Sequence, residues 1–267
     1  MRLTKRPVLS VPIQKAAQGA LTPAQDLVAV EEPVQIRLDD RDLAITMRTP
    51  GHDAELAVGF LFTEGILADA ASIEDVACTE NTVTVRLKPG SVTGEAASQE
   101  RRFYLTSSCG VCGKASIDAI VSSGCTAAPG DRPVVSASVI RGLPETLRLT
   151  QPVFDRTGGL HAAALFDATG NLALVREDVG RHNAVDKLIG RSVLDGRVPL
   201  HESVLLVSGR ASFELVQKAA MAGIPILAAV GAPSSLAVET ALRFGMTLAG
   251  FVREGRFNVY SGAQRIV

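Results

Sequence analysis

Two cysteines in the segment TSSCGVCGK (residues 106–114) are the residues whose type and spacing most directly indicate chemistry. Cys109 and Cys112 stand two residues apart, and the chain of 267 residues has only four cysteines. A close pair of thiols can clamp a metal, form a reversible disulfide or carry sulfur. Glycines and serines surround the pair, which predicts a loop and not a packed element.

A zinc site is the weakest of these hypotheses. Structural zinc normally takes four ligands, and the other two cysteines, Cys78 and Cys125, stand alone. A catalytic zinc held by the cysteine pair and His161 would resemble the zinc deaminases, whose histidine motif carries a glutamate two residues further on. That position is Ala163 here, so the general acid/base is missing. We therefore expect no metal site and no deaminase chemistry.

Disulfide exchange and sulfur carriage both remain open. A thioredoxin-type dithiol lowers its thiol pKa at a helix N-terminus, whereas this pair has the surroundings of a loop, although Lys114 would favour a thiolate. A sulfur carrier needs an accessible, mobile thiolate that takes the terminal sulfur of a donor persulfide, and a second thiol can release that sulfur by forming a disulfide. The glycine-flanked loop favours the sulfur carrier and leaves thiol-disulfide oxidoreductase as the second hypothesis.

A group of polar residues follows a predicted strand in REDVGRHNAVDK (residues 176–187). Arg181 is suited to phosphate, and His182 and Asn183 are suited to the edge of a ring. A solvated helix face would also account for the charges, so the composition leaves both interpretations open. His161, which follows a glycine pair at the start of another predicted strand, is a further candidate of second rank.

Two loops that contain glycine and serine follow apolar runs, VSGRAS (residues 207–212) and VGAPSS (residues 230–235). Glycine lets a backbone approach a ligand closely, and serine can cap a helix or hold a phosphate oxygen. In the first loop the candidate contacts are Ser208, Gly209 and the phosphate-binding fork of Arg210. Ordinary strand-to-helix loops would explain either segment alone, but two in one sheet favour a ligand site at its edge.

The elements that would position these residues alternate along the second half of the chain. A hairpin over residues 162–167 and 172–176 precedes a helix that begins near Asp178. Apolar runs then alternate with helical patterns: strands are expected at 203–207, 226–230 and 246–252, and helices at 213–220 and 236–244. Continuous apolar strands between helices predict parallel strands buried on both faces, and the hairpin makes the sheet mixed.

The first hundred or so residues predict a smaller α+β unit. Strands are expected at 33–38, 43–48 and 82–87, with a helix at 55–66. We therefore expect an α/β protein with three parts: an N-terminal α+β domain (1–105), a flexible loop and linker with the cysteine pair (106–133), and a mixed-sheet, three-layer α/β domain (134–267) that binds the ligand.

The overall charge excludes some classes of partner. With 27 basic and 28 acidic side chains the formal net charge is −1, which argues against nucleic acid or anionic lipid as a partner. The apolar stretch after Arg6 is too short for a signal peptide, and no later segment reaches the ~18 apolar residues of a membrane span. We expect a cytoplasmic protein without a membrane partner, in a compartment where thiols stay reduced.

Together the motifs closely resemble the FdhD family of formate dehydrogenase accessory sulfurtransferases. The segments that carry this resemblance are, in order, SSCGVCGK, GGLHAAALF, EDVGRHNAVDKLIG, SGRASFELVQKAAMAGIPILAAVGAPSSLAVETA and FVREGRFNVYSGAQRI. The resemblance covers the chain from the strand-rich front to the last residues, without a departure at the cysteine pair.

The resemblance implies a sulfur carrier that formate dehydrogenase needs for activity. It implies a persulfide on Cys109 with Cys112 as its partner, a cysteine desulfurase as donor, and transfer of the sulfur to the molybdenum cofactor, as bis(molybdopterin guanine dinucleotide), before the cofactor enters formate dehydrogenase. It also implies a homodimer and a cytidine-deaminase-like fold of the C-terminal domain. Cofactor binding is implied for Phe251, Val252, Arg253, Glu254, Gly255 and Arg256.

The polar residues fit such a ligand, because a cofactor with guanines and pyrophosphates needs several phosphate and ring-edge contacts. A guanine nucleotide is therefore expected to mimic it. A twofold dimer would offer two equivalent pockets to a roughly symmetric ligand. The alternative of another class is a chaperone that binds the molybdenum cofactor without covalent sulfur transfer, which would have no need of the cysteine pair.

Overall fold

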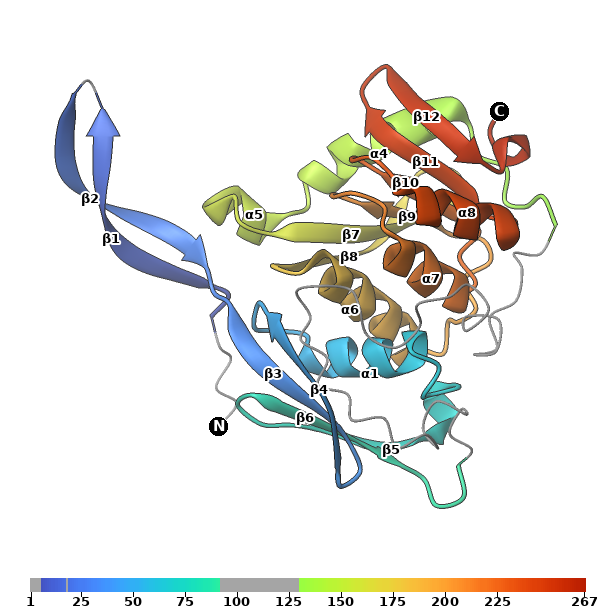
Figure 1. Cartoon of the computed structure of the whole chain (residues 1–267), viewed down its shortest axis with the longest axis horizontal. Helices are drawn as coiled ribbons and strands as arrows, with labels where there is room; N and C mark the ends of the chain where they lie inside the picture. Colours follow the sequence, from blue (N-terminus) through green and yellow to red (C-terminus); the bar gives the residue numbers. More distant parts are fainter. Residues whose placement is uncertain (1–5, 18, 92–129) are drawn as a thin grey trace.

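The computed structural model describes residues 6–17, 19–91 and 130–267. The described residues form three sheets of two, four and six strands with helices between them, a mixed α/β fold (Figure 1). Two of the predicted functional residues, Cys109 and Cys112, lie outside the described residues, as does most of the predicted linker.

The six-stranded sheet is mixed, as the sequence predicts. Its strand order is β12-β11-β10-β9-β7-β8. Strands β9, β10 and β11 are parallel, whereas β7, β8 and β12 run antiparallel to their neighbours. The strands are β7 (His161–Phe166), β8 (Leu172–Asp178), β9 (Val204–Val207), β10 (Ile226–Ala229), β11 (Thr247–Arg253) and β12 (Arg256–Ser261).

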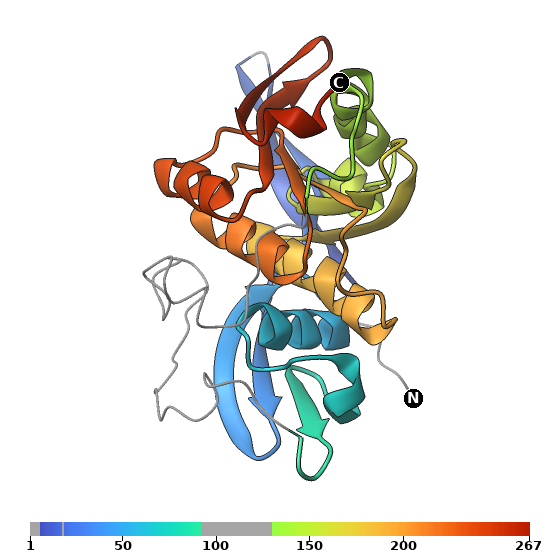
Figure 2. The same cartoon turned by 90° about the vertical axis from the view of Figure 1, so that its right-hand side faces the viewer.

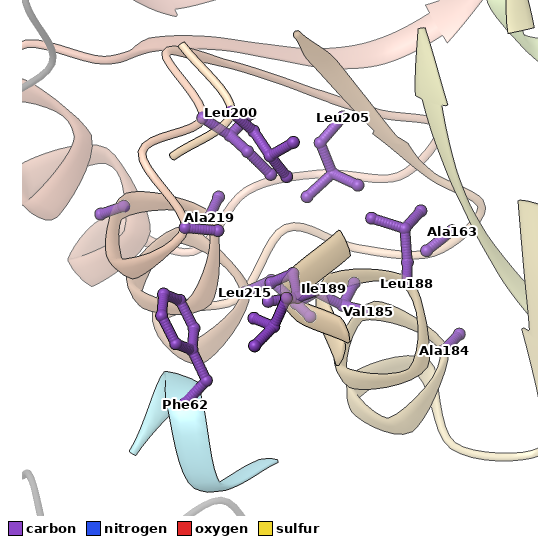
Figure 3. Close-up of a cluster of buried hydrophobic side chains, with 14 of the residues drawn as sticks. Phe62, Ala163, Ala184, Val185, Leu188, Ile189, Leu200, Leu205, Leu215 and Ala219 are labelled. Atoms are coloured by element: carbon purple, nitrogen blue, oxygen red, sulfur yellow. The ribbon is translucent and has the colours of Figure 1, made fainter. Parts of the chain in front are cut away.

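Helices cover both faces of this sheet and confirm the predicted three layers (Figure 2). Alternation along β9 shows why: Leu205 and Val207 pack toward one group of helices, and Val204 and Leu206 pack toward the other face. One face carries α6 (Arg181–Leu194), α7 (Phe213–Met221) and α8 (Ser235–Arg243); the opposite face carries α4 (Ala137–Arg148). Figure 3 shows part of the core between the sheet and α6 and α7.

The front of the chain forms the four-stranded sheet, with strand order β4-β3-β6-β5, and a helix, α1. In Figure 1 α1 lies between this sheet and α6. The bounds are β3 (Glu32–Leu38), β4 (Arg41–Arg48), α1 (Asp53–Thr63), the 3-10 turn η1 (Ala70–Ser72), β5 (Ile73–Cys78) and β6 (Thr82–Leu87). Strands β3, β4 and β6 and helix α1 confirm the predicted elements.

The crossing of α1 and α6 is unusually close. A Cβ atom at Gly59 would lie 1.8 Å from the carbonyl oxygen of Asp186, and one at Gly190 would lie 1.8 Å from that of Glu55. The two backbones therefore touch where only glycine fits. Because of this contact a single hydrophobic cluster runs from the small sheet through α1 and α6 to the large sheet.

Several elements have no counterpart among the predictions. They are β1 (Val8–Ala17), β2 (Ala20–Ala29), β5, α4, α5 (Pro152–Thr157), β12 and the final 3-10 turn η2 (Ala263–Arg265). Strands β1 and β2 pair along their length as a ribbon that extends from the body (Figure 1). Helix α4 contains Gly142 and Pro144, which mask its pattern of buried Ile140, Leu143 and Leu147.

Helix α6 begins later than the sequence predicts. The sequence pattern predicts a start near Asp178, but Asp178 is the last residue of β8 and the helix begins at Arg181. The carboxylate of Asp178 is fully buried and accepts hydrogen bonds from the main-chain N–H groups of Thr49 and Gly180. These bonds hold the chain extended up to Gly180, which is the N-cap residue of α6.

Candidate functional site

Two loops and the last part of β11 lie against one another at the carboxyl ends of the parallel strands. The N–H of Gly231, after β10, donates to the carbonyl of Gly209, after β9, over 2.9 Å. The N–H of Phe251, in β11, donates in turn to the carbonyl of Gly231 over 3.1 Å. A Cβ atom at Gly231 would lie 3.0 Å from the main chain of Arg210, so glycine permits this approach. The two glycine–serine loops thus lie side by side, at the sheet edge where α/β proteins collect ligands.

Next to these loops lies a cavity of about 970 Å³. Pockets of roughly 300–1,000 Å³ are typical of small-molecule sites. One wall comes from α4 and α5 and the other from the strand ends. The lining residues are Arg141, Gly142, Pro144, Glu145, Leu147, Arg148, Gln151, Phe154, Gly158, Gly159, Leu160, His161, Val179, Ser208, Val230, Glu254 and Gly255. Four predicted site residues, His161, Ser208, Glu254 and Gly255, therefore line one cavity.

His161 stands at the first position of β7, between the cavity and the loop after β9. Its ring lies 3.5 Å from where a Cβ atom of Gly209 would be, and the side chain of Arg181 lies 3.7 Å from the same point. Burial, followed by the positive charge of Arg181, lowers the pKa of His161 below its usual value. The imidazole is therefore neutral at pH 7 and can accept a hydrogen bond from a ligand.

Arg181 has unsatisfied hydrogen-bonding capacity. Its Nε atom is buried and, within the part of the chain that the structure describes, has no hydrogen-bond partner. Arg181 is also the first residue of α6, where free main-chain N–H groups and the helix dipole favour an anion. A buried donor without a partner costs free energy, which a bound anion would offset.

His182 connects the start of α6 to the start of α7. Its Nε2 atom lies 3.2 Å from the hydroxyl oxygen of Ser212, the N-cap residue of α7. Burial first, and then the charges of Arg181 and Lys218, lower the pKa of His182 to about 4. Glu214 opposes this shift at 3.8 Å but does not outweigh it. His182 is therefore neutral at pH 7 and joins two helix N-termini that face the same region.

Asn183 has a different environment from its two neighbours. Its side-chain nitrogen donates to the carbonyl of Met47 over 2.7 Å, and its side-chain oxygen accepts from Thr46 over 3.3 Å. The residue is 6% exposed. Asn183 thus connects α6 to β4, and both polar atoms of its side-chain amide already have hydrogen-bond partners within the protein.

The same surroundings contain a buried ion pair. Lys187 Nζ lies 2.6 Å from a carboxylate oxygen of Asp178 and donates to the carbonyl of Thr49 over 2.8 Å. Asp178 also accepts from the Asn183 amide over 3.1 Å. We call Asp178, Asn183 and Lys187, with the main chain of Thr49, the α6 joint. It holds the turn between β4 and α1 against the start of α6.

The remaining predicted residues lie at or near the loops but differ in exposure. Arg210 is exposed, and so are Arg253 and Arg256, which face each other in the register of β11 and β12. The Val252 side chain is fully buried in the core beside α4, which leaves only its main chain for a ligand. Phe251 is 37% exposed and has a left-handed backbone with φ of 52°.

The sequence profile of the FdhD/NarQ family matches residues 29–267 of the chain. The chain belongs to this family. The resemblance read from the motifs is therefore confirmed, and the match spans every described element from β3 to η2.

Similar proteins and a similar solved structure support this family assignment. The chain is 53% identical to a sulfur carrier protein FdhD of Streptomyces avermitilis over 93% of this chain and 92% of that protein. It is 44% identical to a protein of the same name from Sulfolobus acidocaldarius, over 97% and 98%. The crystal structure of a candidate formate dehydrogenase accessory protein from Desulfotalea psychrophila has a TM-score of 0.79 and 27% identity, covering 98% of this chain and all of that one.

The sequence analysis does not predict the residues that form one wall of the cavity. Arg141, Glu145 and Arg148 project from α4, and Gln151 and Phe154 come from the start of α5. The two arginines and the glutamate are three or four residues apart, so on a helix they lie on one face, and this spacing could have indicated the wall. The spacing has meaning only once α4 is recognised as a helix, and Gly142 and Pro144 make that helix hard to predict.

The described residues contain no group of three or more histidine, cysteine, aspartate or glutamate side chains placed to hold a metal ion. Among the helices in those same ranges, none is long and apolar enough to span a membrane. Cys78, at the end of β5, is exposed.

Proposed function

We propose that this chain is a sulfur carrier that formate dehydrogenase needs in order to become active. Cys109 accepts sulfur as a persulfide from a cysteine desulfurase, and the sulfur passes to bis(molybdopterin guanine dinucleotide) before this cofactor enters formate dehydrogenase. The names of the relatives support the sulfur-carrier role, and the accessory-protein structure supports formate dehydrogenase as the recipient.

The sulfur steps follow from the chemistry of the cysteine pair. The Cys109 thiolate attacks the terminal sulfur of the donor persulfide, so that a new S–S bond forms on Cys109 and the desulfurase leaves as a thiolate. If the Cys112 thiolate then attacks the Cys109 sulfur, a Cys109–Cys112 disulfide forms and the outer sulfur leaves as hydrosulfide. A cellular thiol reductant restores the pair. In this scheme the protein is a sulfurtransferase whose cysteine pair must be reduced after each transfer of sulfur.

The cavity beside the stacked loops is the observation that supports cofactor binding. Its volume suits one guanine nucleotide half of the cofactor, and Arg141 and Arg148 supply cations for phosphate on one wall. The unpartnered Nε of Arg181 and the neutral His161 stand beside the opposite wall. Two such cavities in a homodimer would hold both halves of a roughly symmetric ligand. The proposal also includes a cytoplasmic location and a cytidine-deaminase-like fold for the larger domain.

Reconstitution tests this function. Apo-formate dehydrogenase, cofactor, a cysteine desulfurase and cysteine are combined with the wild-type chain or a variant, and formate oxidation is measured. The wild type and Cys78→Ala, the matched control, should activate the dehydrogenase, and Cys109→Ala should not. Activation by Cys109→Ala at the wild-type rate would favour a cofactor-binding chaperone without covalent sulfur transfer.

Nucleotide binding tests the cofactor site separately. Guanosine diphosphate should bind the wild type, and Arg210→Ala should weaken this binding about tenfold if Arg210 holds a phosphate. Arg243→Ala, which removes an exposed arginine at the far end of α8 from the loops, is the control. Unchanged binding by Arg210→Ala would remove this residue from the site.

A further inference from the structure

Helix α5 is a short helix that forms part of the cavity wall and has no side-chain cap of its own at its N-terminus. Its N-cap residue, Gln151, makes no side-chain capping bond. Instead, the carboxylate of Glu177 in β8 accepts hydrogen bonds from the N–H of Val153 over 3.1 Å and of Phe154 over 2.8 Å. A residue of the edge strand thus satisfies the first free N–H groups of α5 and fixes where the helix starts.

The same helix holds an arginine of the cavity. The guanidinium of Arg148 lies over the ring of Phe154, 5.0 Å from its centroid, and forms an ion pair with Asp155. Both contacts come from the first turns of α5. Arg148 and Phe154 line the cavity. The position of the guanidinium therefore depends on where α5 stands.

The side chains of Glu177 and Asp178 point to opposite faces of β8. Successive side chains of a strand point in opposite directions, so Asp178 faces the α6 joint and Glu177 faces α5. Glu177 is half-buried, and its charged neighbours are Asp155 and Arg148. Burial raises the pKa of Glu177, and the N–H groups of Phe154 and Val153 and the charge of Arg148 oppose this shift without outweighing it. The two main-chain hydrogen bonds nevertheless anchor the start of α5.

We propose that Glu177 is a positioning residue for the cavity: it anchors the start of α5 and thereby orients Arg148 toward the anionic part of the ligand. This inference rests on the proposed function, because it needs the cavity to hold the nucleotide part of the cofactor. Glu177 itself does not touch the ligand. It acts through Phe154 and Asp155, which hold the guanidinium.

A double-mutant cycle tests the coupling. Guanosine diphosphate is titrated into the wild type, Glu177→Gln, Arg148→Ala and the double variant. Each single change should raise Kd about tenfold, which corresponds to one lost charge-assisted contact. Since both act through one guanidinium, the double variant should bind within about threefold of the weaker single variant. A product of the two effects, about a hundredfold, or no effect of Glu177→Gln, would overturn the proposal.

A control variant and a second test variant accompany this cycle. Glu239→Gln, which neutralises an exposed carboxylate on α8, should leave Kd unchanged. Phe154→Leu keeps the N–H groups that Glu177 accepts but removes the ring beneath Arg148. It should weaken binding as much as Glu177→Gln does. If Glu177→Gln does not fold, Glu177→Asp replaces it in the cycle, because the shorter side chain keeps the charge but cannot reach both N–H groups.

Amide hydrogen exchange separates this inference from the proposed function. In Glu177→Gln the amides of Val153 and Phe154 should exchange at least tenfold faster, while those of β9 and β10 keep their protection. Unchanged exchange at α5 would overturn the anchor even if the nucleotide binds. If the wild type binds no guanosine diphosphate, the proposal that the cavity holds the nucleotide part of the cofactor is wrong. The role of Glu177 in ligand binding is then wrong as well, even if the exchange data show that Glu177 anchors α5.

Discussion

The α6 joint and the cavity adjoin the same strand pair, β7 and β8, and they differ in how many hydrogen-bond partners their polar groups have. In the joint, Asp178 and Lys187 are almost fully buried, and each has several protein partners. Beside the cavity, Arg181 has a buried Nε without a partner in the described residues, and His161 is held neutral. A cluster whose polar groups all have partners fixes the architecture, whereas a buried donor without a partner needs an explanation, and a bound ligand is the one that we propose.

One segment of the chain supplies residues to both the joint and the loops. The segment REDVGRHNAVDK contains both kinds of residue in alternation. Asp178, Asn183 and Lys187 join α6 to the β4–α1 turn, and Arg181 and His182, between them, reach the loops. The joint therefore aligns the start of α6 so that Arg181 stands beside Gly209. This division leads to predictions that decrease in expected size from the joint to the cavity.

The largest effect is expected from breaking the joint. Asp178→Ala leaves Lys187 as a buried charge without its carboxylate, so the free energy of unfolding should fall by about 3–5 kcal/mol. Urea denaturation measures it. Asp195→Ala, which removes the exposed partner of Arg191, is the matched control and should cost about 1 kcal/mol or less. A loss below about 1 kcal/mol for Asp178→Ala would mean that the joint is not a structural centre.

The crossing of α1 and α6 should be nearly as sensitive. Gly59→Ala would place a Cβ atom 1.8 Å from a carbonyl oxygen of α6, so the helices must separate. We expect a loss of about 3 kcal/mol, measured as a lower urea midpoint at unchanged slope. Gly142→Ala in α4 meets no atom within 4 Å and should be neutral or stabilise by up to about 1 kcal/mol. Equal results for the two variants would contradict the close crossing.

An intermediate effect is expected from acid. Burial alone would raise the pKa of Glu55, but hydrogen bonds and charges from His52 and Arg176 outweigh it and lower the pKa to about 2. Because this folded-state pKa lies below the ordinary glutamate value of 4.5, the ionised carboxylate stabilises the fold at higher pH. That contribution should disappear as the pH falls from about 4.5 to about 2. Arg176 donates to Glu55 over 2.9 Å, so the lost contact links α1 to β8.

Thermal unfolding between pH 2 and pH 7 measures this dependence. Glu55→Gln should be less stable than the wild type at pH 7, and the difference should shrink as the pH falls toward 2. A difference between the two proteins that stays constant over this range would show that Glu55 keeps an ordinary pKa.

The smallest effect on stability is expected beside the cavity. Arg181→Ala removes a donor without a partner, so the free energy of unfolding should change by no more than about 0.5 kcal/mol. Binding of guanosine diphosphate should nevertheless weaken about tenfold. A large loss of stability with unchanged binding would place Arg181 with the joint and not with the ligand site.

Local patterns predicted much of the fold. Strand β6 and the buried strands β9 to β11 follow from alternating or continuous apolar runs, and α7 and α8 follow from helical spacing. The ribbon of β1 and β2 was missed because Pro12 and Pro23 interrupt its pattern, and proline is accepted there only on an edge. Helix α4 was missed because Gly142 and Pro144 lower its apparent propensity.

The candidate site was predicted in part. Four of the residues named from the sequence line the cavity: His161, Ser208, Glu254 and Gly255. Ser208 was named because glycine and polar residues after strands mark a sheet edge, and His161 because it follows a glycine pair at the start of a strand. Glu254 and Gly255 were named only through the resemblance to the family. The sequence could not separate Asn183 from Arg181 and His182, since burial and partner choice depend on the distant β4–α1 turn. The role of Cys109 and Cys112 remains a prediction from the motif, because both lie outside the described residues.

The central claim, that this chain carries sulfur on Cys109, is tested most directly by mass. The purified protein is incubated with a cysteine desulfurase and cysteine without reductant, and intact masses of the wild type, Cys109→Ala and Cys78→Ala are compared. The account predicts one or more added sulfur atoms on the wild type and on Cys78→Ala, and none on Cys109→Ala. Added sulfur on Cys109→Ala at the wild-type level, or none on the wild type with a donor active on another acceptor, would contradict it.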